Sequence, residues 1–339
     1  MDNATEISGV DSTQRSITIP VLVIFAFPAF VCFLFILYHT IKSPRRLVFD
    51  TINNHIIFLI LIFDFLSLST EMPITLYYLE ISGVDSTQRS ITIPVLVIFA
   101  FPAFVCFLFI LYHTIKSPRR LVFDTINNHI IFLILIFDFL SLSTEMPITL
   151  YYLAHGNVHT VKICLFWNFW NYTLHVVSLI LTEYASIERY FLVFHRHAVL
   201  KHKVLFHYIP MLCLTIYISL WYFYLVFFLP CPKNRLLDIT VFTCGMPCFF
   251  GYASITAYDA IANLMLPSLV ILIFNALMVV RVITSRTVAL GPIPVRETLK
   301  KNRRMILQLL GISLLSLIMW LPWIVILIGK DFFDPSFGN

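Results

Sequence analysis

Charge is scarce in this sequence of 339 residues: Asp, Glu, Lys and Arg make up 12% of it, whereas 59% of the residues are hydrophobic. Soluble domains carry about twice that fraction of charge, so the composition excludes an ordinary soluble globular protein. The apolar runs also lack the alternation of a transmembrane β-barrel, and several exceed the roughly 20 residues that a helix needs to cross a bilayer. The sequence therefore predicts an all-α polytopic membrane protein.

Three other patterns are absent as well. The sequence has no basic patch interleaved with aromatic residues outside the apolar runs, so its net charge of +5 does not predict a nucleic-acid partner. It has no catalytic constellation, and the histidines between 195 and 207 are not spaced like a standard metal site, so an enzyme is not expected. Its first sixteen residues are polar and lack the basic start of a cleavable signal peptide.

A direct repeat covers almost half of the chain, because residues 6–79 and 80–153 are identical at every position. Repeat architectures normally diverge, above all in their loops. Identity through loops and apolar runs alike favours a very recent duplication, or an exon duplicated in the gene model, over a functional repeat. Each copy contains two apolar runs that are separated by a short basic turn with a proline.

Eight apolar runs are long enough to be transmembrane helices. They cover about 17–41, 54–79, 91–115, 128–153, 164–190, 207–229, 259–285 and 305–328. The alternate loops that begin after the first run contain 17 of the 23 lysines and arginines, so the positive-inside rule places the N-terminus outside the cell. The glycosylation sequon Asn3-Ala4-Thr5 fits that orientation. Four cysteines then lie outside, where they can form disulfides in any of three pairings: Cys164, Cys231, Cys244 and Cys248.

The run from Cys164 to Arg189 organises the rest of the chain. As a helix it spans roughly 37 Å, which is enough to cross the bilayer core and to enter both interfaces. Five polar residues recur along it at helical spacing and form one stripe that must face other helices: Asn171, His175, Ser178, Thr182 and Arg189. Helix packing in any multi-span protein would also produce such a stripe.

These residues resemble those of a rhodopsin-like (class A) G-protein-coupled receptor. The third helix of that family has a cysteine and an Asp-Arg-Tyr motif at the spacing found here between Cys164 and Glu188-Arg189-Tyr190. The other matches follow in the family's order: Asp138 with Pro147, Pro267, and Trp320-Leu321-Pro322. The resemblance covers about 80–329 as receptor helices 1–6. Residues 1–79 are then an extra copy of the helix 1–2 hairpin, and residues 330–339 are a short tail.

The sequence also departs from the family. Ile110 stands where the first helix usually has an asparagine, Trp221 falls several residues late in the fourth helix, and Asn275 replaces an inward tyrosine in the fifth. Only the short tail follows the last apolar run, so no seventh helix with its Asn-Pro-x-x-Tyr motif is expected. The expected bundle is therefore receptor helices 1–2 in duplicate, followed by helices 3–6.

The resemblance implies a multi-pass receptor of the plasma membrane that couples an extracellular ligand to a heterotrimeric G protein. It implies these roles: Glu188, Arg189 and Tyr190 as the G-protein switch; Asn171, His175 and Trp320 as the ligand pocket; Pro267 and Pro322 as helix kinks; Asp138 and Ser178 as a sodium site; and a disulfide from Cys164, for which Cys248 is favoured. Asn171 stands where amine receptors have an aspartate, so a peptide-like ligand is expected. No cofactor besides sodium is expected.

Alternative interpretations remain open at this point. A neutral, hydrogen-bonded Asp138 needs no sodium ion, and Asn171, His175 and Trp320 could simply be packing residues. The chain could be a truncated or rearranged receptor product that does not signal. It could also be a transporter built on the tandem repeat, although such a protein would need more intramembrane charges than this sequence has.

Overall fold

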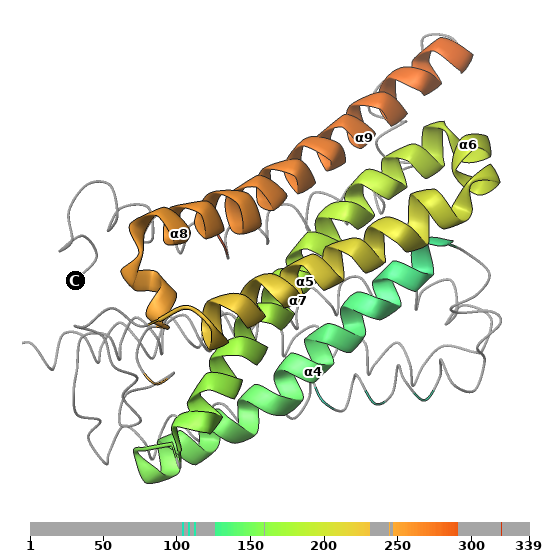
Figure 1. Ribbon diagram of the computed structural model, residues 1–339. Helices are drawn as coiled ribbons and strands as arrows, with labels where there is room; N and C mark the ends of the chain where they lie inside the picture. The colour runs from blue at the N-terminus through green and yellow to red at the C-terminus, as the bar shows by residue number, and fades with distance from the viewer. Residues whose placement is uncertain are drawn as a thin grey trace, which may run out of the picture.

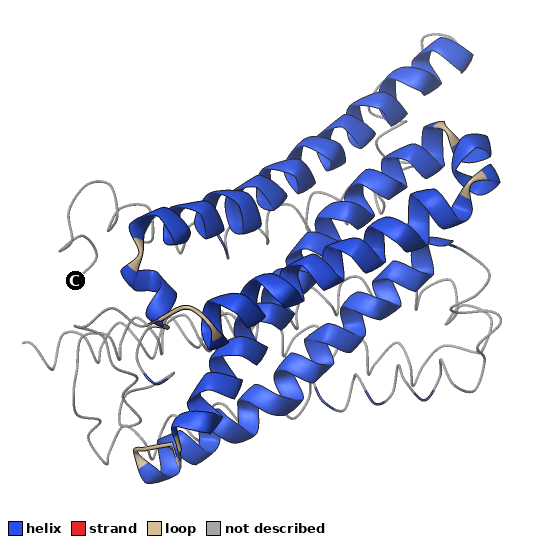
Figure 2. Cartoon of the chain, in the orientation of Figure 1, coloured by secondary structure: helices blue, strands red, loops and turns tan. Residues whose placement is uncertain are grey.

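The computed structural model describes residues 126–158, 160–230 and 247–290, together with Phe104, Leu108, Tyr112, Cys244 and Trp320. Within these residues every regular element is a helix and none is a strand (Figure 2). The all-α class that the composition predicts is therefore confirmed for the described part of the chain.

Nine helical elements follow one another in the described ranges. They are α4 (Ile126–His155), α5 (Val161–Phe194), α6 (Arg196–Lys201), η2 (Val204–Tyr208), α7 (Ile209–Phe227), η4 (Cys248–Gly251), α8 (Ala253–Tyr258), η5 (Asp259–Met265) and α9 (Leu266–Leu290). Of these, η2 and η5 are π-helical and η4 is a single 3-10 turn.

Four segments are long and apolar enough to cross a membrane: His129–His155, Val161–Leu192, Val204–Phe227 and Ala253–Arg281. They coincide with the runs predicted at 128–153, 164–190, 207–229 and 259–285. The runs predicted at 17–41, 54–79, 91–115 and 305–328 lie outside the described residues, apart from Phe104, Leu108, Tyr112 and Trp320. The total of eight therefore stays a prediction.

Two residues explain why α4 and α5 form a hairpin. Gly156 follows α4 with a φ of 75°, a left-handed conformation that glycine adopts without a Cβ clash, and its N–H bonds to the carbonyl oxygen of Tyr152 at 2.7 Å. Thr160 is extended and caps α5, because its side-chain oxygen accepts the N–H of Ile163 at 3.4 Å. The chain thus reverses between the two helices within a few residues.

Each π-helical turn lies just before a proline. Proline lacks an N–H, and its ring crowds the carbonyl group four residues earlier, so a widened turn relieves the clash. Pro210 follows η2, and Pro267, the predicted kink, follows η5 at the start of α9. The carbonyl that Pro210 cannot bond belongs to Phe206, and the hydroxyl of Tyr184 on α5 donates to it. The other predicted kink, Pro322, lies outside the described residues.

Helix α5 is the central element of the described bundle. It contacts α4, α7, α9 and η5, and Figure 1 shows α4, α7 and α9 running alongside it. In its most apolar window 56% of the residues are buried, against 17% in the segment that contains α7. The main apolar core therefore forms around α5 and includes Leu179 and Ile180 of α5, Ile134 and Leu135 of α4, Ile218 and Leu225 of α7, and Ile271 of α9.

The disulfide differs from the predicted Cys164–Cys248 pairing, which is wrong. Cys164 is bonded to Cys244, and their Cα atoms lie 5.7 Å apart. Cys244 is buried in a small apolar cluster with Trp167, whereas Cys248 begins η4, whose Phe249 enters the main core. Cys248 is itself disulfide-bonded, to a partner outside the described residues. Sequence spacing could not choose between two such close cysteines, because the choice depends on the path of the loop.

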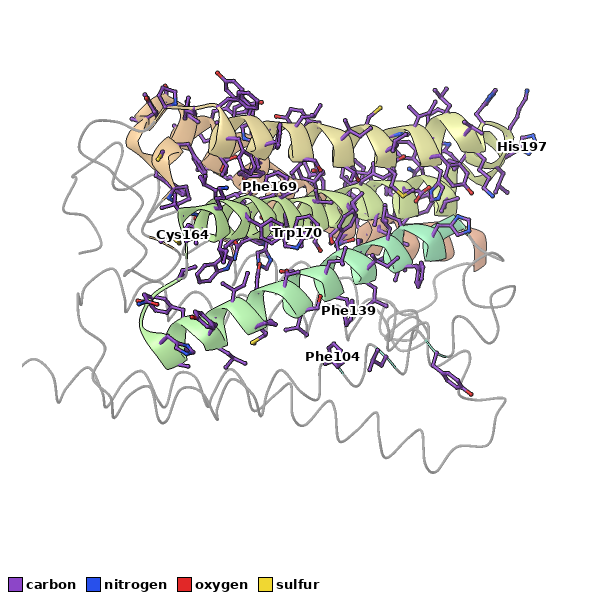
Figure 3. The ribbon with its side chains drawn as sticks, turned by 60° about the horizontal axis from the view of Figure 1, so that its bottom comes forward. Phe104, Phe139, Cys164, Phe169, Trp170 and His197 are labelled. Carbon is purple, nitrogen blue, oxygen red and sulfur yellow. A yellow bond between two sulfur atoms is a disulfide. The ribbon has the colours of Figure 1, made fainter. Side chains whose placement is uncertain are left out.

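We name the two ends of the bundle by their residues. The disulfide end contains Cys164 and Cys244, and the Arg189 end contains Glu188, Arg189 and Tyr190. Figure 3 labels Cys164 at one end of the bundle and His197 of α6, just beyond the Arg189 end, at the other. The uninterrupted helix α5 therefore connects the disulfide to the Glu-Arg-Tyr motif, as the sequence predicts.

Candidate functional site

A buried acid–histidine pair lies at the Arg189 end. Oε1 of Glu188 lies 2.6 Å from Nδ1 of His207, and the two side chains are 1% and 0% exposed. The two side chains share one short hydrogen bond that links α5 to η2. His207 of η2 thus holds Glu188 by a hydrogen bond. The pair fixes the end of α5 to the segment that leads into α7.

The surroundings of His207 bring a third helix to the same place. The imidazole ring of His129, from α4, has its centroid 5.4 Å from that of His207. The hydroxyl of Tyr208 lies 3.4 Å from Nδ1 of His129, and the ammonium group of Lys203 lies 5.6 Å from the Tyr208 ring centroid. Helices α4 and α5 and the start of α7 therefore meet through polar and aromatic groups at this end.

A second contact at the Arg189 end joins α5 to α9. Arg281 of α9 donates a hydrogen bond to the hydroxyl of Tyr190, and its guanidinium carbon lies 5.5 Å from the ring centroid of Tyr190 and 4.5 Å from that of Phe194. Phe274 of α9 packs edge-on against Tyr190 at 5.7 Å. We call this contact the Arg281 clamp. It is exposed, so each cation–π contact contributes only about 0.5–1 kcal/mol.

The motif therefore contacts different helices through consecutive residues. Glu188 is bonded to η2, Tyr190 is bonded to α9, and the half-buried Arg189 lies between them on α5. The sequence placed these three residues together at a helix end. It predicted neither partner.

The middle of the bundle contains the predicted pair of Asp138 and Ser178. The Ser178 hydroxyl donates to Oδ1 of Asp138 at 2.6 Å, and the two residues are 3% and 8% exposed. Their proximity across α4 and α5 is what the sequence predicted. A carboxylate and a hydroxyl are the hard oxygen donors that a small cation prefers, so these residues fit a sodium ion chemically. A site that binds no sodium ion would have the same hydrogen bond.

Nearer the disulfide end, α4 and α5 share a second polar contact. Nε2 of His175 lies 3.2 and 3.3 Å from the two carboxylate oxygens of Glu145 and 3.4 Å from Oγ of Ser141. The acid and the hydroxyl thus approach the same ring nitrogen. A serine-histidine-acid catalytic triad uses opposite nitrogens, so this arrangement is not one. It instead continues a polar strip along α4 that begins at Asp138.

The predicted pocket residues occupy different surroundings. His175 pairs with Glu145, Trp320 is 9% exposed and belongs to the main apolar core, and Asn171 is half-buried on α5. Their joint role in binding a ligand stays a prediction.

A buried acid that the sequence did not predict as a site residue lies between α7 and η5. Asp259 is 3% exposed and receives three donors: Nε1 of Trp221 at 3.0 Å, the Tyr222 hydroxyl at 3.0 Å from both carboxylate oxygens, and Nδ2 of Asn263 at 2.7 Å. The donors fill most of the acceptor positions of the carboxylate, so the cluster is suited to joining two helices. An acid within a predicted apolar run was a signal that could have indicated it.

Aromatic side chains extend this cluster toward α5. The ring of Tyr172 stacks on that of Tyr222 at 5.8 Å and meets Phe249 of η4 edge-on at 5.6 Å. The loop that carries Cys244 is therefore connected to α5 by ring packing as well as by the disulfide.

In comparisons with known proteins, no family model and no curated protein matches this chain.

Proposed function

We propose that this chain is a rhodopsin-like receptor that transmits the binding of an extracellular ligand to a heterotrimeric G protein. The observation that carries the proposal is the course of α5. One helix carries a disulfide to the loop before α8 in its first turn, lies against α4, α7 and α9, and carries Glu188, Arg189 and Tyr190 near its other end. A signal that shifts one end of this helix has a continuous, packed route to the other.

The disulfide end is the proposed ligand side. Cys244 fixes the loop over the end of α5, and Phe249 packs on Tyr172, so a ligand that moves this loop also moves α5. His175 lies one helical turn further in than Asn171 and is held by Glu145. Asn171, His175 and Trp320 form the proposed pocket, and the absence of an acid at Asn171 favours a peptide-like ligand. In this proposal the N-terminus and the disulfide end face the outside of the plasma membrane.

The Arg189 end is the proposed G-protein side. Arginine keeps its charge in any protein environment and offers five donors, which suits it to bind backbone carbonyls of a partner helix. The Arg281 clamp closes α9 against this end through an exposed contact of modest strength. Its release would free Tyr190, next to Arg189, from α9 at low energetic cost. Between the two ends, Asp138 and Ser178 would hold a sodium ion that favours one arrangement of α4 and α5.

The proposal is tested by Arg189→Ala in reporter cells that express the chain with a panel of heterotrimeric G proteins. Constitutive nucleotide exchange should exceed that of untransfected cells and should fall to that background in the variant. Lys201→Ala, which removes an exposed cation of α6, is the matched control and should retain exchange. Equal exchange by the Arg189→Ala variant and the parent chain, at equal surface expression, would reject the switch.

A second function is favoured by one observation: α4 buries two acids, Asp138 and Glu145, on the face that meets α5. Buried carboxylates along one interface are typical of cation or proton pathways. If the chain is a transporter, proteoliposomes will show a cation flux that Asp138→Asn and Glu145→Gln abolish. A well-folded surface protein with neither flux nor exchange would identify the non-signalling product.

A further inference from the structure

We propose that two copies of this chain associate in the membrane along the outer face of α7, through the hydroxyl groups of Tyr217 and Tyr258. The two hydroxyl oxygens lie 2.9 Å apart and come from different helices, α7 and α8. We call these two residues the tyrosine pair. The partner is a second copy of the chain in the same orientation, and the interface does not depend on the proposed receptor function.

The tyrosine pair has one more hydrogen-bond donor than it can use. Each hydroxyl has one O–H to donate and can also accept, so two hydroxyls that bond to each other leave one O–H over. In the described part of the chain, each hydroxyl of the pair has only the other as its hydrogen-bond partner. The hydroxyls of Thr215 and Ser219 differ, because they donate to carbonyl oxygens of α7 itself. The surplus donor is therefore a specific property of the tyrosine pair.

The tyrosine pair faces outward from the bundle. Tyr217 and Tyr258 are 41% and 47% exposed, and Figure 3 shows α7 along the upper edge of the bundle. The pair is held in this position, because the ring of Tyr258 packs against that of Trp221 at 5.0 Å and the indole N–H of Trp221 is bonded to Asp259. The surplus O–H is thus presented to whatever lies against α7.

The depth of the tyrosine pair favours a protein partner over a lipid head group. At 1.5 Å per residue, Tyr217 lies roughly 15 Å from the end of α7 and Tyr258 roughly 7 Å from the start of α8, both measured from the disulfide end. The span Val204–Phe227 has 24 residues, or about 36 Å, so it extends only about 3 Å beyond each side of a hydrocarbon core of about 30 Å. The pair therefore lies within the core, where water and phospholipid ester groups do not satisfy a polar group. A second transmembrane chain can supply the acceptor there.

Two-fold symmetry explains how a second copy supplies this acceptor. Two copies in the same orientation are related by an axis along the membrane normal, so each group meets its counterpart at the same depth. Two tyrosine pairs that face each other across this axis can form a closed ring of hydroxyls, in which every O–H donates and every oxygen accepts. Cys213 lies one helical turn from Tyr217 and is free and exposed, so the two Cys213 thiols would also approach each other.

The test measures dimerisation of the purified full chain in phosphatidylcholine vesicles, by energy transfer between copies labelled at the N-terminus, over a series of protein-to-lipid ratios. The parent chain should dimerise. Tyr217→Phe keeps the ring but breaks both hydrogen bonds between the copies, each of which changes an equilibrium constant about threefold, so the dissociation constant should rise about eightfold. Tyr258→Phe should have the same effect. Tyr224→Phe is the matched control on α7: Tyr224 is exposed but lies near the helix end, where its hydroxyl reaches the membrane interface, so the constant should not change.

A second measurement locates the interface. A flexible bismaleimide should produce a Cys213–Cys213 crosslink that peptide mapping identifies, and Cys213→Ser should remove it. A monomeric parent chain, equal dissociation constants for Tyr217→Phe and Tyr224→Phe, or a dimer without this crosslink would overturn the inference. Native mass spectrometry that finds a lipid bound to a monomeric parent chain, but not to Tyr217→Phe, would also overturn it, because the tyrosine pair would then bind a lipid.

Discussion

The hydroxyl of Tyr222 offers a sharp test of the polar cluster between α7 and η5. Its oxygen lies 3.0 Å from both carboxylate oxygens of Asp259, and it is 0% exposed. Tyr222→Phe keeps the ring that stacks on Tyr172 and removes only this donor. The change therefore isolates one hydrogen bond to a buried acid.

The expected effect follows from two bounds. Hydrogen bonds to charged groups contribute about 1.5–3 kcal/mol in soluble proteins, whereas side-chain hydrogen bonds between membrane helices average about 0.6 and reach about 1.7 kcal/mol. Asp259 keeps Trp221 and Asn263 as donors in the variant, which limits the loss. We expect Tyr222→Phe to lower the free energy of unfolding by about 1–2 kcal/mol, which lies above the average for membrane helices and near the lower limit for hydrogen bonds to charged groups.

Tyr224→Phe provides a control on the same helix. Tyr224 is 54% exposed, so loss of its hydroxyl should cost less than about 0.5 kcal/mol, as for most surface substitutions. The measurement is equilibrium unfolding of both variants in mixed micelles, with tryptophan fluorescence as the probe, because Trp221 donates directly to Asp259. Equal losses for the two variants would refute the claim that Asp259 joins α7 to η5 through Tyr222.

Three further predictions concern the disulfide, the clamp and the cation. Peptide mapping without reduction should recover Cys164 linked to Cys244, and Cys244→Ser should destabilise the chain by about 2–4 kcal/mol; a Cys164–Cys248 peptide would contradict the structure. Arg281→Gln removes contacts to two rings that total about 1–2 kcal/mol, so basal exchange should rise about fivefold or more, and Arg281→Lys should raise it less; an unchanged rate would show that the clamp restrains nothing. Sodium at about ten times its dissociation constant should stabilise the parent chain by about 1.4 kcal/mol relative to potassium, and Asp138→Asn should remove this difference. If the difference persists in the variant, Asp138 does not bind the sodium ion.

Elements and their order were predictable from the sequence, because apolar length and helical spacing depend on local residue type. The four described spans lie within a few residues of the predicted runs, and Cys164 and Arg189 lie toward opposite ends of one helix, as predicted. The contact between Asp138 and Ser178 was also predictable, because each is a polar residue on an apolar helix that must find an internal partner.

Partners across longer distances were not predictable to the same degree. The Cys164–Cys244 disulfide depends on how the loop folds over α5, and two cysteines so close in sequence present the same spacing signal. The contact of Glu188 with His207 was not predicted, because the π-helical turn before Pro210 is what presents His207 to it. Asp259 was overlooked because its donors, Trp221 and Tyr222, lie on a different apolar run and only the packing of α7 on η5 brings them together.

We propose above all that the Arg189 end of α5 acts on a heterotrimeric G protein. The most direct measurement is the rate of nucleotide exchange on the purified G protein in the presence of the purified chain in nanodiscs. We predict that the parent chain accelerates exchange above the spontaneous rate and that Arg189→Ala does not. No acceleration by the parent chain, or the same acceleration by the Arg189→Ala variant, would contradict the account.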